Sequence, residues 1–175
     1  MKILSFIVLL CFHTALNAQD DDYNKKIEKR KNKISADRWE SDKGNEDGVY
    51  KARDKKTHKW GMYQITDEFT KILIPMKYDT VRFFNFNGPF TLVWNNGKVG
   101  VFVSPWIDTK GQSIECIYED GKVVHDKEDN YYFAAKKNGK WGWVDFYTGE
   151  EQSAFTASSY SELKLTGNEL SKYYH

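Results

Sequence analysis

The sequence predicts an all-β fold, made of antiparallel β-hairpin/meander repeats in three copies and preceded by one N-terminal amphipathic helix. Three observations support this prediction. After Gly48, short aromatic and β-branched runs alternate with turn residues, as they do in strands. A Lys-x-Gly landmark then recurs, and Gly61, Gly100 and Gly142 lie 39 and then 42 residues apart. Before Ser41 the chain is densely charged, with apolar residues at roughly helical spacing.

The first residues have the features of an export signal. Lys2 supplies a positive charge, and the apolar run Ile3–Leu10 is shorter than the about 20 residues that a transmembrane helix needs. Ala18 is a small residue at the usual cleavage position. We therefore expect residues 1–18 to be removed and the protein to be periplasmic or secreted, with no transmembrane segment.

Composition excludes some classes of partner. The chain has 175 residues, with 26 Lys and Arg against 25 Asp and Glu. Removal of Lys2 with the signal leaves 25 residues of each sign and a net charge of zero. This balance gives no electrostatic argument for binding nucleic acid. The unusual figure is the aromatic content of 16%, which points to a large core or to aromatic binding sites.

Residues 19–48 are expected to form a charged helix and a linker. The helix is predicted over residues 22–38. Its apolar stripe consists of Tyr23, Ile27, Ile34 and Trp39. The basic run from Lys25 to Lys33 is interpreted as a solvated face, with contact to phosphate or lipid headgroups as the alternative. Residues 41–48 are polar and contain glycine, as linkers do.

The repeat domain is expected over residues 49–175 and ends in a short C-terminal tail. Its copies are predicted at about residues 49–87, 88–130 and 131–165. A tyrosine follows each landmark glycine by 17 or 18 residues. These tyrosines are Tyr78, Tyr118 and Tyr160. Two landmarks that keep their register through three copies indicate true internal repeats.

The best-preserved copy reads Lys59-Trp60-Gly61, followed by Ile72-Leu73-Ile74-Pro75-Met76-Lys77-Tyr78-Asp79. It resembles the WG-repeat proteins, whose copies carry a Lys-aromatic-Gly core and then an apolar-Pro-x-Tyr-Asp segment. Copy two has Val99 in place of the tryptophan and lacks the proline, whereas copy three keeps Lys140-Trp141-Gly142. The resemblance covers about residues 49–165. It implies an antiparallel β-repeat domain of a kind common in exported bacterial proteins, and it implies no shared catalytic residues.

Two Asn-Gly pairs predict the hairpin register. Asn96-Gly97 and Asn138-Gly139 favour two-residue type I′ turns, because both residue types tolerate a positive φ. The predicted cross-strand pairs are Trp94 with Val99 and Val93 with Gly100 in copy two, and Lys136 with Trp141, Ala135 with Gly142 and Ala134 with Trp143 in copy three. Copy one has a loop that is longer by two residues.

This register assigns a structural core to the repeat, with four tryptophans on one strand face. The predicted core residues are Trp60, Gly61, Tyr78, Trp94, Gly100, Tyr118, Trp141, Gly142, Trp143 and Tyr160. Because a glycine inside a strand marks a bulge or a close approach, neighbouring copies are expected to stack closely at Gly100 and Gly142.

No catalytic, metal-binding or cofactor-binding residue is predicted, and no cofactor is expected. His58, His125 and His175 are isolated in sequence and do not have the spacing of metal ligands. Cys116 is the only cysteine after signal removal and is interpreted as a small buried apolar residue. A hydrolase that acts on a cell-wall or host polymer through unrecognised carboxylates remains the alternative.

Aromatic residues outside the repeat pattern are the candidates for binding. Trp106 follows Pro105 in a stretch where copy two departs from the others, and Tyr131, Tyr173 and Tyr174 are weaker candidates. The sequence therefore predicts an exported, non-enzymatic binding module that recognises a protein partner or an envelope polysaccharide.

Overall fold

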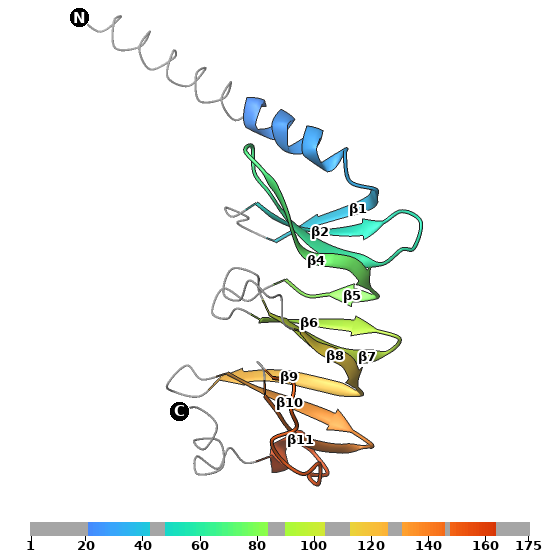
Figure 1. The fold of residues 1–175 in the computed structure, drawn as a ribbon, viewed down its shortest axis with the longest axis vertical. Helices are drawn as coiled ribbons and strands as arrows, with labels where there is room; N and C mark the ends of the chain where they lie inside the picture. Colours follow the sequence, from blue (N-terminus) through green and yellow to red (C-terminus); the bar gives the residue numbers. More distant parts are fainter. Residues whose placement is uncertain are drawn as a thin grey trace, which may run out of the picture. The chain divides into compact units, whose positions relative to one another are not determined.

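The computed structural model describes residues 21–42, 48–83, 90–103, 113–125, 131–145 and 148–163. In this part of the chain, three antiparallel sheets follow one α-helix near the N-terminus, which confirms the all-β class (Figure 1). The chain forms two compact units, which divide between Met76 and Lys77. The first 18 residues, and with them the expected export signal, lie outside the described residues.

The helix differs from the prediction. It covers residues 21–31, and strand β1 (Ala36–Ser41) occupies the region where the helix was expected to end. Among the predicted stripe residues, Ile27 is buried, but Trp39 lies on the strand. A thin stripe gives a helix little packing energy. Pairing of β1 with the next strand, β2 (Val49–Asp54), outweighs the local helical preference.

The first unit contains a sheet in the order β1-β2-β3-β4, where β3 is Trp60–Ile65 and β4 is Thr70–Tyr78, whose last two residues belong to the second unit. The helix covers one face of this sheet, since Ile27 belongs to the same apolar cluster as Ala52, Tyr63 and Ile65. The β2–β3 turn is closed by a hydrogen bond from the Asp54 amide to the Lys59 carbonyl, at 2.8 Å. It therefore has the two extra residues that were expected.

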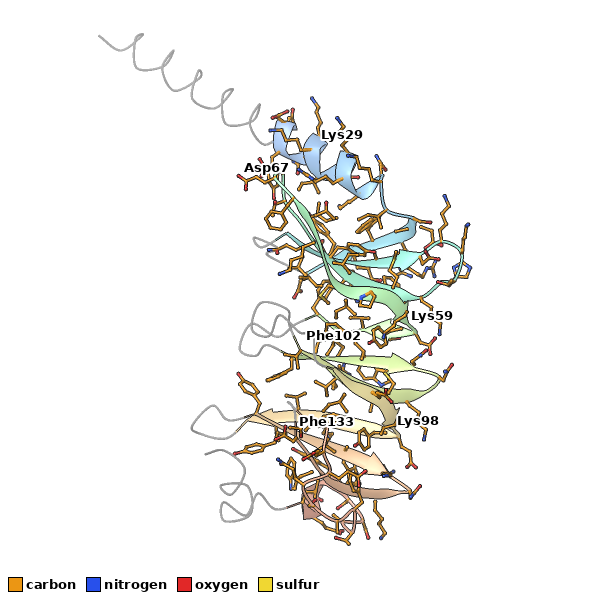
Figure 2. The ribbon with its side chains drawn as sticks, viewed as in Figure 1. Lys29, Lys59, Asp67, Lys98, Phe102 and Phe133 are labelled. Carbon is orange, nitrogen blue, oxygen red and sulfur yellow. The ribbon has the colours of Figure 1, made fainter. Side chains whose placement is uncertain are left out.

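The second unit contains two sheets. The first has the order β5-β6-β7-β8, with strands Thr80–Val81, Phe90–Asn95, Lys98–Val103 and Ser113–Tyr118. The second has the order β11-β10-β9, where β9 is Asp120–His125, β10 is Tyr131–Lys137 and β11 is Lys140–Val144. One core joins them, because Val99 and Val101 cluster with Phe133 and Ala135. Figure 2 labels Phe133 at this junction.

The hairpin registers are confirmed in both Asn-Gly copies. All five predicted cross-strand pairs occur, including Trp94 with Val99 and Ala134 with Trp143. The φ angles of Asn96 and Gly97 are 52° and 70°. Those of Asn138 and Gly139 are 51° and 74°. Positive φ at both central residues is the type I′ geometry, which matches the twist of the flanking strands.

Two of the landmark tyrosines are followed by an acid, in Tyr78-Asp79 and Tyr118-Glu119, and this Tyr-acid landmark lies where the chain passes from one sheet to the next. β4 ends at Tyr78 and β5 begins at Thr80, and β8 ends at Tyr118 with β9 beginning at Asp120. The three sheets thus begin at Ala36, Thr80 and Asp120, whereas the copies were expected to begin near residues 49, 88 and 131. Each sheet therefore begins one strand before the expected start of a copy.

An acid at each junction is directed at the hairpin that follows. Asp79 Oδ2 accepts a hydrogen bond from the Asn96 amide at 2.5 Å, and Glu119 Oε2 accepts one from the Gly139 amide at 3.0 Å. In the first sheet, Asp37 lies at a register shift in β1 and forms a salt bridge with Arg53 at 2.9 Å. Asp37 therefore takes the register position of a junction acid in the first sheet, although among the described residues no sheet precedes it.

The landmark glycines do lie at close approaches, but the expected partner was wrong. A Cβ on Gly61 would be 2.6 Å from the Ile74 carbonyl oxygen, and one on Gly100 would collide with the backbone of Ile114. In both cases the partner is the next strand of the same sheet, not a neighbouring copy. At Gly142 it is the Phe155 ring, at 2.8 Å.

The third sheet ends differently from the other two. Residues after β11 run beside it through isolated bridges, Trp141 with Ala157 and Val144 with Glu151. Tyr160 lies in a 3-10 helix (Tyr160–Glu162) and not at a strand end, because no strand of a following sheet continues from it in the described chain.

Candidate functional site

The aromatic residues singled out for binding are largely not part of the described structure. Trp106, Tyr173 and Tyr174 lie outside the described residues. Tyr131 is half-buried in β10, and its ring packs edge-on against Phe90 with centroids 5.3 Å apart. Tyr131 thus borders the core between the two sheets of the second unit. The structure gives it a packing role.

The four tryptophans assigned to one strand face are buried to different extents. Trp141 and Trp143 are each 6% exposed and cluster with Tyr132 and Ala134. Trp60 and Trp94 are only half-buried. Both have cationic side chains beside their rings. Within the described residues, no such cation lies over the rings of the two buried tryptophans.

Two cation–aromatic contacts have their cations at the same register position of two sheets, although their rings come from different places in the fold. The Arg82 guanidinium lies 5.0 Å from the Trp94 ring centroid, and Lys122 Nζ lies 4.4 Å from that of Tyr160. Arg82 and Lys122 each follow a junction acid by three residues, at the edge of their sheets. We call these two contacts the edge pairs.

The cations of the edge pairs are available to a ligand. Both side chains are exposed, and neither forms a salt bridge within the described residues. The ring of each pair is held in place by the fold. Trp94 packs against the core between the two sheets, and the Tyr160 ring lies 5.6 Å from that of Trp141. Each edge pair therefore offers a fixed aromatic surface beside a free positive charge.

The first sheet has a different arrangement around Trp60. Its ring is approached by Arg38, Lys51 and Arg53 at 5.6, 5.5 and 6.0 Å. At the repeat position of Arg82 and Lys122 this sheet has an acid, Glu40.

These three cations are already paired. Glu40 accepts from Lys51 at 2.7 Å and from Arg38 at 3.0 Å, while Asp37 holds Arg53. Hydrogen bonds from Lys51 and from Arg53 lower the pKa of Glu40 and of Asp37, respectively, so both acids stay charged. The Trp60 cluster is thus largely self-neutralised.

The N-terminal helix presents the basic run mostly to solvent. Lys25 and Lys29 are exposed, and Lys26 pairs with Asp22 at 2.9 Å. Lys31 turns toward the sheet instead, with Nζ 4.1 Å from the Tyr50 ring centroid. Figure 2 labels Lys29 on the helix.

The described residues give little support for a metal site, a reactive thiol or a membrane-spanning helix. No group of three or more His, Cys, Asp or Glu side chains is placed there to hold a metal ion. The Cys116 Sγ lies 3.5 Å from the Val93 carbonyl oxygen, and burial raises the pKa of this thiol. A neutral thiol is a poor nucleophile. Among the described helices, none is both long and apolar enough to cross a membrane.

Comparison with known proteins gives no precedent for the site: no family model, curated protein or solved structure matches the chain. Sequence reasoning placed Trp94 and Tyr160 in the core and did not single out Arg82 or Lys122. One signal could have revealed the two cations, since each lies three residues after the acid of the Tyr-acid landmark.

Proposed function

We propose that this chain is an exported, non-enzymatic binding module of the WG-repeat type that recognises an envelope polysaccharide. The observation that carries the proposal is that two exposed cations at the same register position of two stacked sheets, Arg82 and Lys122, each lie beside an aromatic ring, Trp94 and Tyr160 respectively. An aromatic ring offers a flat apolar surface to the CH groups of a sugar, and the adjacent cation donates hydrogen bonds.

Recurrence favours a polymer over a folded protein as the ligand. A polysaccharide presents the same groups at regular intervals, so cations at the same register position of successive sheets can bind successive units. Each contact alone is weak, but two linked contacts gain from a high effective concentration. A folded protein partner has no such repeat to match, although it could use the extended surface of a repeat stack.

The family and the export route rest on the sequence. The Lys-Trp-Gly and Tyr-Asp landmarks support a WG-type repeat, and the three sheets offer a structural counterpart to its copies. The charged, apolar and small-residue pattern of residues 1–18 supports export, which would bring the protein to the envelope polysaccharides.

Affinity electrophoresis tests this function. The purified protein is run in native gels that each contain one polysaccharide, neutral (dextran, hydroxyethyl cellulose) or acidic (hyaluronan, polygalacturonate), beside an unrelated protein of similar size and charge. We expect specific retardation by at least one polymer and no change in polymer length after incubation. Retardation by none of them would contradict the proposal, and a shortened polymer would favour the hydrolase alternative.

A further inference from the structure

We infer that the ligand is an acidic polysaccharide with about one anionic group per disaccharide, bound across both edge pairs. This inference rests on the proposed function and narrows its ligand to one class of polysaccharide. It draws on two further observations, the charge around each pair and the stacking of the two sheets that carry them.

The charge around the edge pairs favours an anion. Arg82 directly follows β5, and its neighbours on that face are Thr80 on β5 and Leu92 and Trp94 on β6, all uncharged. Arg82 is therefore the one charged group of that set. An exposed guanidinium with no carboxylate partner can form charge-assisted hydrogen bonds with an incoming carboxylate or sulfate.

Lys122 has a similar balance. Its neighbours on β9 and β10 include Asp120 and Lys136, which are opposite each other in the register and offset each other's charge. Among these strand neighbours, the net charge is therefore that of Lys122 itself. By contrast, Glu40 at the same repeat position of the first sheet neutralises its neighbours, so that sheet offers no comparable anion site.

The stacking of the sheets sets the spacing. Sheets β5–β8 and β9–β11 share a core formed by Val99, Val101, Phe133 and Ala135. Sheets that pack face to face lie about 10 Å apart, which is close to the length of one disaccharide in an extended chain. At this general separation, the two cations at the same register position of the sheets would meet anionic groups on alternate sugars.

The experiment measures affinity by isothermal titration calorimetry with hyaluronan oligosaccharides, which carry a carboxylate on alternate sugars. Dextran is the neutral comparison and polyglutamate is the polyanion without sugars. The variants are Arg82→Gln, Lys122→Gln and the double variant. A Lys25→Gln/Lys29→Gln variant is the matched control, because it changes the net charge equally at exposed lysines that have no salt bridge among the described residues.

For the wild type we expect affinity for a hyaluronan tetrasaccharide to exceed that for the disaccharide by at least about tenfold, since only the longer chain reaches both pairs. Each single variant should lose this gain, and the double variant should lose binding. The helix control should keep the wild-type affinity. Added salt should weaken binding, as for exposed charges.

The contrary outcomes separate the two claims. Equal affinity for dextran and hyaluronan, unaffected by the double variant, would overturn the acidic ligand and leave the proposed function intact. Binding to polyglutamate as tight as to hyaluronan, or an equal loss in the helix control, would reduce the effect to general electrostatics and overturn the inference. A tetrasaccharide gain that survives either single variant would overturn bridging. If the protein bound none of the polysaccharides tested, the proposed function itself would be overturned.

Discussion

Trp60 and Trp141 occupy the same repeat position, directly before a landmark glycine, yet their surroundings differ. Trp141 is 6% exposed and is covered by the segment that follows β11, including Ala157 and Tyr160. Trp60 is half-buried and surrounded by cations. The landmark therefore fixes strand register, whereas the segment that covers the strand face decides whether its tryptophan builds a core.

The first edge of each sheet shows the same kind of difference in charge. Glu40, Arg82 and Lys122 follow their junction acids by the same three residues. Glu40 neutralises two cations near Trp60, while Arg82 and Lys122 stay unpaired within the described chain and lie over single rings. One repeat position thus serves a closed ionic network in one sheet and open edge pairs in the other two.

The largest effect is expected at the tryptophans. Trp141→Ala should lower the free energy of unfolding by about 3–5 kcal/mol, the usual cost of truncating a buried aromatic residue. Trp60→Ala should cost about 1 kcal/mol, because its ring is only partly removed from water. Urea unfolding followed by far-ultraviolet circular dichroism measures both. Equal losses would mean that the two positions are covered alike.

The landmark glycines should give the next largest effect. Gly61→Ala should cost about 2–3 kcal/mol, because its Cβ would meet the backbone atoms of Ile74 and Met76, which cannot rotate away. Gly142→Ala should cost about 1 kcal/mol or less, since the obstacle is the movable Phe155 ring. The same urea experiment applies. A costlier change at Gly142 would show that Phe155 is held as rigidly as a strand.

At neutral pH, the smallest of these effects on stability is expected from the ionisation of Tyr118. Tyr118 is 1% exposed, between the rings of Phe133 and Phe155, and burial raises its pKa to about 12. The fold thus favours the neutral phenol. This contribution to stability is complete below the unfolded pKa of about 10 and is lost as the pH rises from there toward 12.

Melting temperatures of the wild type and of Tyr118→Phe, measured across this range, test the assignment. The difference between the two proteins should be constant below pH about 10, and above it the wild type should fall relative to the variant. Parallel curves up to pH about 12 would mean that the Tyr118 phenol ionises as freely as in an unfolded chain.

The parts of the fold that local chemistry determines could be predicted. Asn96-Gly97 and Asn138-Gly139 specify the type I′ turns, and a two-residue turn then fixes every cross-strand pair. Strand β1 could not be predicted in the same way. Its sequence from Ala36 to Ser41 is mostly polar, and it becomes a strand because it pairs with β2, the next strand in the chain.

The candidate site was harder to predict, because its contacts are not local. Arg82 lies 12 residues before Trp94, and Lys122 lies 38 residues before Tyr160. The second contact depends on how the chain folds back after β11, which has no counterpart in the other two copies. The sequence signal used for the binding site was an aromatic residue outside the repeat pattern. This signal selected Trp106, which lies outside the described residues.

Hydroxyl-radical footprinting with mass spectrometry, with and without hyaluronan, tests the central claim most directly, because it reports each aromatic residue separately. Without ligand, Trp60 and Trp94 should be labelled and Trp141 and Trp143 protected. With ligand, labelling should fall at Trp94 and Tyr160 and stay unchanged at Trp60. Protection of Trp60 alone, or unchanged labelling at both edge pairs under conditions where the polymer binds, would contradict the account.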